Sequence, residues 1–296
     1  MEKVLVMLST YNGEKYIREQ LDSIVNQKNV EVSIVVRDDG SKDNTCNILQ
    51  EYKDRNLLHF YIGENVGPYW SFMDLIYGAK DFKYYALADQ DDVWDENKLA
   101  MAVERLGNTD KPELYYHAMS IVDEKLNPYD FYFRETKYST SFINTLLYGD
   151  EIAGCTMVFN KALLDKLKLY RPKFLTMHDG WIHRVCLCCA GTVIADNKSY
   201  ILYRQHGNNA VGMKKRSFKN YIITGLERTQ SFSKLAEEML CGYGCFITAE
   251  KKRCLQKAIY CKKIKNKLWL IKQSIASDAT NTEKMKLCIK VIIGGY

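Results

Sequence analysis

The sequence predicts an α/β fold, with a central, mostly parallel mixed sheet flanked by helices and a helical C-terminal extension. Three observations predict it. Short apolar runs alternate with amphipathic runs through roughly the first 100 residues. Polar residues closely follow three of these apolar runs. From about residue 218 onwards, apolar residues recur at the spacings of three and four that are typical of helices.

The first apolar run, Val4–Leu8, is continuous, as expected of a strand that is buried on both faces of a parallel sheet. Residues 14–26 follow as an amphipathic helix, because Ile17, Leu21 and Ile24 fall on one of its faces. The same alternation predicts further strands at 32–36, 58–62 and 84–88, and further helices at about 44–52 and 70–79.

Three strand ends in this part of the chain are polar. Residues 10–12 (Thr-Tyr-Asn), 38–39 (Asp-Asp) and 89–92 (Asp-Gln-Asp-Asp) each begin within two residues of the end of a predicted strand. In open α/β sheets, ligands bind beyond the carboxyl ends of the strands. The sequence therefore predicts a binding site along one edge of the sheet.

The acidic turn after residue 88 favours a divalent cation. Three acids, Asp89, Asp91 and Asp92, lie within four residues and repel one another unless a positive charge lies among them. A hard cation with oxygen ligands suits such a turn and commonly shares its ligands with substrate phosphates. The turn on its own is equally typical of a solvated acidic loop in which Asp95 caps the next helix, but the neighbouring polar strand ends favour the binding site. An EF-hand is disfavoured, because Trp94 falls where that loop needs glycine.

Several function classes are disfavoured. Neither a G-x-G-x-x-G nor a P-loop motif follows the first strand, which argues against dinucleotide cofactors and leaves a cation as the main diphosphate contact. The ten cysteines lack zinc spacings and are expected to be reduced, mostly buried thiols. No apolar run reaches the length of a membrane span, and Val4–Leu8 is too short for a signal-peptide core. We therefore expect a cytoplasmic protein.

The second half of the chain carries longer and more aromatic pieces. Most aromatic residues of 115–138 are expected in the core, and some are candidates for stacking on a sugar. Residues 152–159 are predicted to form a strand, in which Gly154 allows close approach of the backbone. Asp179 lies in the first turn of a predicted helix, where acids also occur for capping reasons alone. His206 lies in a predicted strand and loop over 200–212 and, by itself, is typical of a surface histidine.

The charge is uneven along the chain. Nine basic residues and no acid lie between Lys251 and Lys272, whereas the rest of the chain sums to about −3, which argues against a nucleic-acid binder. Residues 251–275 are expected to form an amphipathic surface. Two interpretations stay open: a solvated helix packed on the main domain, or a surface that rests on anionic lipid headgroups. The apolar positions on the predicted face are Leu255, Ala258, Ile264, Leu268, Ile271 and Ile275.

Taken together, these segments resemble the inverting family 2 glycosyltransferases of the GT-A fold, and most of all their bacterial rhamnosyltransferase-like branch. The resemblance covers roughly residues 3–212. Its most specific segment is the D-x-D motif in Ala88–Trp94, and the ordered set of segments is far more specific than any one of them. The other matching segments are Thr10–Asn12, Asp38–Ser41, Gly154–Thr156, His178–Trp181 and Tyr203–Asn208.

The resemblance implies a role for each matching residue. The nucleotide-sugar site would comprise Thr10, Tyr11, Asn12, Asp38, Asp39, Asp89 and Gln90. Mg²⁺ or Mn²⁺ would bind to Asp91 and Asp89, with His206 as a further contact. Asp179 would be the general base, and the acceptor would contact Trp94, His178 and Trp181. The branch often has a bulky aromatic residue where this chain has Gly180, which leaves the acceptor open.

The resemblance also implies an organisation and a reaction. Residues 1–215 would form the GT-A domain, with a nucleotide-sugar half at about 1–100 and an acceptor half at about 101–215, and 216–296 the basic extension. The enzyme would transfer a sugar with inversion, preferably L-rhamnose from dTDP-L-rhamnose, to a saccharide or lipid-linked saccharide of a cell-surface polysaccharide. The alternatives are a UDP-hexose donor, a nucleotidyltransferase, a non-catalytic nucleotide- or carbohydrate-binding module, and a membrane-surface scaffold. The expected location is the cytoplasm, and a peripheral position on the inner face of the plasma membrane stays open through the basic stretch 251–275.

Overall fold

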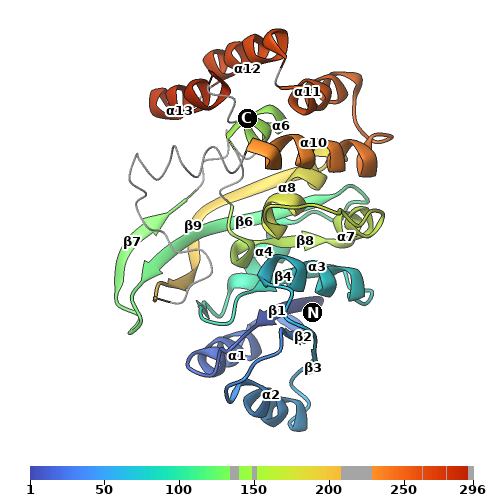
Figure 1. The fold of residues 1–296 in the computed structure, drawn as a ribbon. Helices are drawn as coiled ribbons and strands as arrows, with labels where there is room; N and C mark the ends of the chain where they lie inside the picture. The colour runs from blue at the N-terminus through green and yellow to red at the C-terminus, as the bar shows by residue number, and fades with distance from the viewer. Residues whose placement is uncertain (134–139, 149–151, 208–228, 262, 278, 293–296) are drawn as a thin grey trace.

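The fold comes from a computed structural model, which describes residues 1–133, 140–148, 152–207, 229–261, 263–277 and 279–292 (Figure 1). Within these ranges nine strands form one mixed sheet in the order β3-β2-β1-β4-β8-β6-β9-β5, with β7 paired to β6. Helices cover both faces, so the predicted α/β fold is confirmed. The strands are β1 (Glu2–Thr10), β2 (Val30–Asp38), β3 (His59–Ile62), β4 (Tyr84–Ala88), β5 (Val93–Trp94), β6 (Glu113–Val122), β7 (Pro128–Tyr132), β8 (Val158–Asn160) and β9 (Thr192–Arg204).

The helices follow the strands closely in the first half and gather at the end of the chain. The helices of the first half are α1 (Ile17–Val25), α2 (Thr45–Asp54), α3 (Pro68–Gly78) and α4 (Lys98–Arg105). Those of the second half are α6 (Phe142–Tyr148), α7 (Lys161–Lys168), α8 (His178–Cys188), α10 (Thr229–Tyr243), α11 (Ala249–Ile259), α12 (Ile264–Ala276) and α13 (Asn281–Ile292).

The first four strands of the sheet are parallel, and this brings the polar strand ends together. Strand β1 pairs in parallel with β2 and β4, and β2 pairs in parallel with β3. In this register Thr10 lies beside Asp38, and Leu8 lies beside Ala88. The predicted edge of the sheet, where the three polar segments meet, is therefore confirmed.

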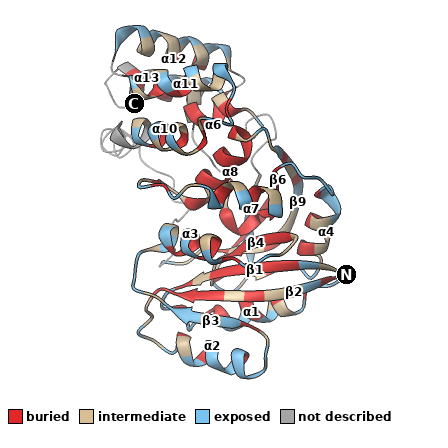
Figure 2. Ribbon diagram, turned by 90° about the vertical axis from the view of Figure 1, so that its right-hand side faces the viewer, coloured by how far each residue is buried: buried red, intermediate tan, exposed pale blue. Residues whose placement is uncertain are grey.

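Strand β1 is buried on both faces, and its alternating side chains enter two different cores. Val4, Val6 and Leu8 pack with α1, α2 and α4 on one face. Leu5 and Met7 pack with α3, α7 and α8 on the other. Figure 2 shows β4 and the central part of β1, Val4–Leu8, buried between these helical layers. The continuous apolar run predicted burial of β1 on both faces, because an alternating pattern is typical of a strand with one face exposed to solvent.

Three predicted elements differ from the structure. The strand predicted at 152–159 is a 3-10 turn, Gly154–Thr156, followed by the short strand β8. On β7 the rings of Tyr129 and Phe131 are exposed, so the core prediction is wrong for these two residues. The basic stretch 251–275 forms two helices, α11 and α12, instead of one continuous face.

The C-terminal helices pack in two groups. Helices α10 and α11 add Leu235, Met239 and Leu255 to the core that covers α3, α7 and α8. Helices α12 and α13 form a smaller core with α6, which includes Leu270 and Leu287. The predicted domain boundary at 215/216 lies outside the described residues, as do 208–212 of the predicted loop. No helix among the described residues is both long and apolar enough to span a bilayer.

Candidate active site

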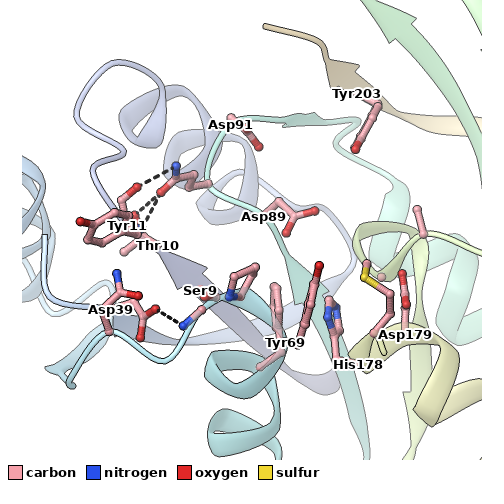
Figure 3. A pocket seen from close by; sticks show the side chains of 18 residues that line it. Ser9, Thr10, Tyr11, Asp39, Tyr69, Asp89, Asp91, His178, Asp179 and Tyr203 are labelled. Atoms are coloured by element: carbon pink, nitrogen blue, oxygen red, sulfur yellow. Dashed lines mark hydrogen bonds between the residues drawn. The ribbon is translucent and has the colours of Figure 1, made fainter. Parts of the chain in front are cut away.

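A pocket of about 350 Å³ opens beyond the carboxyl ends of β1, β2 and β4 (Figure 3). The N-terminal ends of α3 and α8 close its other side. Eight of the residues predicted from the sequence line it: Thr10, Tyr11, Asp39, Asp89, Gln90, Asp91, His178 and Asp179. Its lining also includes Tyr203, which begins a segment matched to the family, and five residues that the sequence analysis did not single out: Ser9, Asn65, Tyr69, Phe72 and Met177.

Gln90 links the acidic turn to the loop after β1. Its Oε1 accepts hydrogen bonds from Thr10 Oγ1 (2.6 Å) and from the Tyr11 backbone N–H (2.8 Å). Its Nε2 donates to the Tyr11 carbonyl at 3.2 Å. The ring of Tyr11 is 44% exposed at the mouth of the pocket, so it is open to a flat ligand.

The loop after β2 uses its two aspartates differently. Asp38 is fully buried and accepts from the backbone N–H groups of Gly40 (3.0 Å) and Ser41 (2.8 Å), so it shapes the loop. Gly40 has φ of 82°, the left-handed conformation that this turn requires. Asp39 lines the pocket, where it is paired with Arg37 and accepts from the N–H of Gly67 at 2.9 Å.

Asn12 joins the two loops outside the pocket. Its backbone N–H donates to Ser41 Oγ at 2.8 Å, and its Oδ1 accepts from the Lys42 N–H at 2.8 Å. It does not line the pocket. Asn12 and Asp38 therefore hold the loops on which Tyr11 and Asp39 sit.

Asp91 points into the pocket and is held from behind by His206. Asp91 Oδ2 and His206 Nε2 form a hydrogen bond of 2.8 Å. Burial raises the pKa of Asp91, and the bond to His206 opposes this rise. The imidazole ring lies 4.8 Å from the ring of Tyr16 and outside the pocket lining. In this geometry His206 orients Asp91, as the second partner of a metal-binding carboxylate commonly does.

The acidic turn concentrates negative charge at the middle of the pocket. Burial, together with the charges of Asp91 and Asp179, raises the pKa of Asp89 to about 7. Asp92 lies beneath and is fully buried; one of its carboxylate oxygens accepts from the Arg204 N–H, and the other has no hydrogen-bond partner in the described chain. Carboxylates that crowd one another in this way favour a bound cation, which removes the repulsion.

The donor atoms fit a hard ion better than a soft one. Atoms of Asp89, Asp92 and Cys155 lie within 4.8 Å of one another. Thiolates prefer soft metals, whereas carboxylate oxygens suit Mg²⁺ and Mn²⁺. Burial raises the pKa of the Cys155 thiol well above its usual range, which opposes the thiolate form. Asp91 and Asp89 both line the pocket and are thus the carboxylates best placed to share an ion with a ligand.

His178 presents an unpartnered imidazole to the pocket. Its ring stacks on Phe72 with centroids 4.2 Å apart, and neither ring nitrogen has a hydrogen-bond partner among the described residues. Burial lowers the pKa of His178 to about 3, so the ring is neutral. Gly154 makes room for it, because a Cβ there would lie 2.5 Å from Nε2. Both ring nitrogens are buried, so the ring forms part of the pocket wall, and a ligand would reach Nδ1 or Nε2 only after a neighbouring group moved.

Asp179 lies in the first turn of α8, half-buried, beside His178. Its Oδ1 accepts from the Gly180 N–H at 2.6 Å. Its charge contributes to the raised pKa of Asp89, so the two carboxylates share one electrostatic environment. Figure 3 shows Asp179 at the end of the pocket opposite Tyr11 and Asp39, with Asp89 between.

Comparison with known proteins decides the family. A sequence model described as glycosyl transferase family 2 matches residues 5–166, which is more than half of the chain. The chain belongs to glycosyl transferase family 2. The matched region contains the ends of β1, β2 and β4 that line the pocket, together with the acidic turn.

Relatives of this glycosyltransferase come from several bacteria. A dTDP-rhamnosyl transferase of Shigella flexneri, RfbG, is 28% identical over 249 residues, covering 77% of this chain and 81% of the relative. An uncharacterised glycosyltransferase of Rickettsia typhi is 30% identical over 182 residues, covering 60% of this chain and 56% of the relative.

Solved structures share the fold at low identity. TarS of S. aureus, residues 1–349 in complex with UDP-GlcNAc, has a TM-score of 0.62 at 18% identity, covering 99% of this chain and 82% of that chain. The mannosyltransferase PcManGT of Pyrobaculum calidifontis, in complex with GDP-Man and Mn²⁺, has a TM-score of 0.52 at 16% identity. The match covers 99% of this chain and 87% of that chain.

Two tryptophans predicted to contact the acceptor lie in the interior of the glycosyltransferase. Trp94 is 4% exposed, and Lys98 Nζ lies 3.9 Å from the centre of its ring. Trp181 has no exposed surface and packs against Tyr170 and Tyr243. Neither ring lines the pocket. We therefore correct this expectation and keep only His178 as an acceptor contact.

Two buried basic residues beneath the glycosyltransferase pocket were not found from the sequence. Lys98 has no exposed surface, and its ammonium group donates to the Cys155 carbonyl. Arg204 is 2% exposed; its Nε donates to the Asp91 carbonyl at 2.8 Å, and its guanidinium is paired with Glu19. Lys98 opposes the charge of the acidic turn, and Arg204 fixes its backbone. The sequence carried no signal for Lys98, which occupies an ordinary helix start.

Lys98 gives a stability prediction. Burial lowers the pKa of Lys98 to about 8, while the nearby charges of Asp92 and Asp89 favour its charged form. Removing one partner from a buried charge group leaves the others uncompensated. We expect Lys98→Met to lower the free energy of unfolding by about 3 kcal/mol in urea titrations at neutral pH. Lys111→Met, at an exposed lysine, is the matched control. A loss no larger for Lys98→Met than for the control would contradict this role.

Proposed function

We propose that this family 2 enzyme is a metal-dependent inverting glycosyltransferase. In this proposal it transfers L-rhamnose from dTDP-L-rhamnose to a saccharide acceptor in the synthesis of a cell-surface polysaccharide. One observation carries the proposal: the acidic pair Asp89 and Asp91 and the half-buried Asp179 line the same pocket. In this arrangement Asp179 would accept a proton from the acceptor, and Asp89 and Asp91 in the same pocket would hold a cation beside the diphosphate.

The order of side chains along the pocket supports the placement of a nucleotide sugar. Tyr11 and Asp39 lie at one end, Asp89 and Asp91 lie in the middle, and Asp179 lies at the other end (Figure 3). A nucleotide sugar has the same order of base, diphosphate and sugar. We therefore place the base beside Tyr11, the ribose near Asp39, the diphosphate near the acidic pair and the sugar near Asp179.

The reaction in this proposal is a single displacement. Asp179 takes the proton of an acceptor hydroxyl while that oxygen forms a bond to the anomeric carbon. The bond from the anomeric carbon to the diphosphate oxygen breaks, and its electron pair leaves with the nucleoside diphosphate. Because the acceptor attacks from the face opposite the leaving group, the anomeric configuration inverts. The stacked rings of His178 and Phe72 line the pocket and would limit where the acceptor lies.

The acidic pair would hold the metal. A bound Mg²⁺ or Mn²⁺ supplies Lewis-acid stabilisation of the departing diphosphate, worth several kcal/mol in comparable sites. Asp91 and Asp89 are the proposed ligands, and His206 keeps the Asp91 carboxylate in place. Without a cation the diphosphate would meet two carboxylates at the middle of the pocket. This predicts that binding of the donor depends on the metal.

The donor is the most open part of the proposal. The similarity to the Shigella dTDP-rhamnosyl transferase supports rhamnose, and the resemblance of the motifs to the same branch supports it independently of the full alignment. The alternative is a UDP-hexose, favoured by the similarity in fold to TarS, which was solved with UDP-GlcNAc. A non-catalytic module of the same fold would bind a nucleotide sugar but would leave it intact.

A thermal-shift panel tests the donor. A ligand at 100 times its Kd stabilises the native state by about 2.7 kcal/mol. For a chain of this size we expect a rise in Tm of about 5 °C with dTDP-rhamnose and Mn²⁺. UDP-GlcNAc and GDP-mannose should give smaller shifts, and EDTA should abolish the effect. A larger shift with UDP-GlcNAc would replace the rhamnose assignment, and the absence of a shift with every donor would contradict the proposed function.

The place of action is part of the same proposal. We propose that the enzyme acts in the cytoplasm at the inner face of the plasma membrane, where a lipid-linked saccharide acceptor would be available. The part of the chain suited to that contact is the basic C-terminal stretch over residues 251–275.

A further inference from the structure

Helix α12 presents an apolar stripe to solvent. Ile264, Leu268 and Ile275 are 76%, 62% and 66% exposed, whereas Ile271 between them is half-buried because it also packs against the small core that α12 forms with α6 and α13. Their spacing of four, three and four residues places them on one face of the helix. Figures 1 and 2 both show α12 as the outermost helix at the end of the molecule that lies farthest from α2. We call this face of Ile264, Leu268, Ile271 and Ile275 the α12 stripe.

The opposite face of α12 fixes the stripe in its outward position. Leu270 is fully buried in the small core with α6 and α13. Ser274, also fully buried, accepts a hydrogen bond or donates one to Tyr148 Oη at 3.0 Å. Trp269 packs beside this core, and Lys257 Nζ of α11 lies 4.5 Å from its ring. The helix therefore cannot bury the α12 stripe by rotating without breaking these contacts.

Lysines border the α12 stripe on both sides. At about 100° per residue, Lys265 and Lys272 fall about 70–90° to one side of the stripe and Lys267 about 70° to the other. The helix contains no acidic residue from Ile264 to Ala276. An apolar centre with basic borders matches the boundary of a bilayer, where apolar side chains enter the acyl region and lysine ammonium groups reach the anionic headgroups.

We infer that the α12 stripe is the surface by which this protein rests on an anionic lipid bilayer. The exposed apolar side chains enter the boundary between headgroups and acyl chains, and the exposed lysines Lys265 and Lys272 contact the lipid phosphates. The charges favour a bilayer over a second copy of the chain. A two-fold contact through the stripe would set the same lysine borders against each other, because such an interface uses the same patch on both subunits.

Co-sedimentation of the full chain with lipid vesicles tests the inference. We expect binding to vesicles of phosphatidylcholine that contain phosphatidylglycerol, weaker binding to phosphatidylcholine alone, and a loss of binding as salt is raised. The double variant Leu268→Glu/Ile275→Glu should reduce binding to the anionic vesicles by at least tenfold. Both positions are exposed, so the fold should persist.

Matched variants separate the stripe from a general effect of charge. Leu169→Glu/Ile62→Glu makes the same two changes at residues that are 59% and 60% exposed elsewhere, and should bind vesicles like the wild type. Lys265→Gln/Lys272→Gln should weaken binding about 30-fold and flatten its salt dependence, since two lysines near an anionic surface together contribute about 2 kcal/mol. The control Lys111→Gln/Lys125→Gln, at exposed lysines of the first half of the chain, should bind the vesicles like the wild type.

The results of these vesicle-binding experiments test the bilayer contact, and they are independent of the tests of glycosyl transfer. Equal binding of the stripe variant and the wild type would overturn the inference. Failure of the wild type to bind anionic vesicles would also overturn the inference. If the wild type then formed a concentration-dependent dimer that the stripe variant did not form, the surface would be assigned to a second copy of the chain. The Tm shift with donor and Mn²⁺ should be the same in the stripe variant and the wild type, so failure of the bilayer contact would remove the proposed place of action and leave the proposed reaction standing.

Discussion

Replacing Asp179 by asparagine is expected to lower the rate of transfer by about 10²- to 10⁴-fold and to leave donor affinity unchanged. The loss corresponds to about 3–5 kcal/mol of transition-state stabilisation. An asparagine can keep the hydrogen bond from the Gly180 N–H to Oδ1, so the first turn of α8 should retain its geometry. The amide cannot take the proton of the acceptor hydroxyl. Transfer to an acceptor and calorimetric titration of the donor measure the two quantities separately.

Asp110→Asn is the matched control for this variant. Asp110 is exposed in the turn before β6, and the same change there should leave turnover and donor affinity as in the wild type. Turnover of Asp179→Asn within threefold of the control would show that another group accepts the proton. A parallel loss of donor affinity would instead make Asp179 a binding residue and would contradict its role as a base.

Asp91→Ala is expected to abolish transfer and to weaken donor binding in the presence of Mn²⁺ by tenfold or more, which is about 1.4 kcal/mol or more. The change removes a proposed metal ligand and leaves His206 without the carboxylate that it holds at 2.8 Å. Titration of the donor with Mn²⁺ and with EDTA measures the effect. The wild type should lose affinity in EDTA, whereas the variant should bind equally weakly in both.

Asp91→Asn separates charge from shape. The amide is nearly isosteric and can still form a hydrogen bond with His206, but it carries no charge for the cation. We expect it to behave like Asp91→Ala in donor binding and in transfer. If Asp91→Asn kept metal-dependent donor binding, the ion would be held by other groups, and Asp91 would serve only to position His206.

The parts of the fold that were predictable rest on strong local patterns. Val4–Leu8 is apolar without alternation, and this required burial on both faces of the sheet. The adjacent polar strand ends then had to meet, because parallel strands share their carboxyl edge. The break between α11 and α12 was not predictable in the same way. Residues 251–275 contain neither proline nor glycine, the usual signals for the end of a helix.

The site was predictable where polar residues follow neighbouring parallel strands, and His178 and Asp179 at the start of α8 were found through the family resemblance. Trp181 was misassigned because two residues along a helix are about 200° apart, so it faces away when Asp179 faces the pocket. Trp94 was misassigned because β5 pairs with β9 and directs the ring towards the core with α1 and α4. Lys98 and Arg204 were missed because a basic side chain is normally solvated, and their burial depends on the folded acidic turn.

Anomalous scattering from Mn²⁺, in crystals grown with the ion and a nucleoside diphosphate, tests the central claim most directly. The claim is that Asp91 and Asp89 hold a divalent ion on the diphosphate in the pocket that Asp179 also lines. We predict one manganese peak within about 2.5 Å of an Asp91 carboxylate oxygen and of a diphosphate oxygen. A diphosphate bound in the pocket with no manganese beside Asp91, or manganese confined to Asp92 and Cys155, would contradict it.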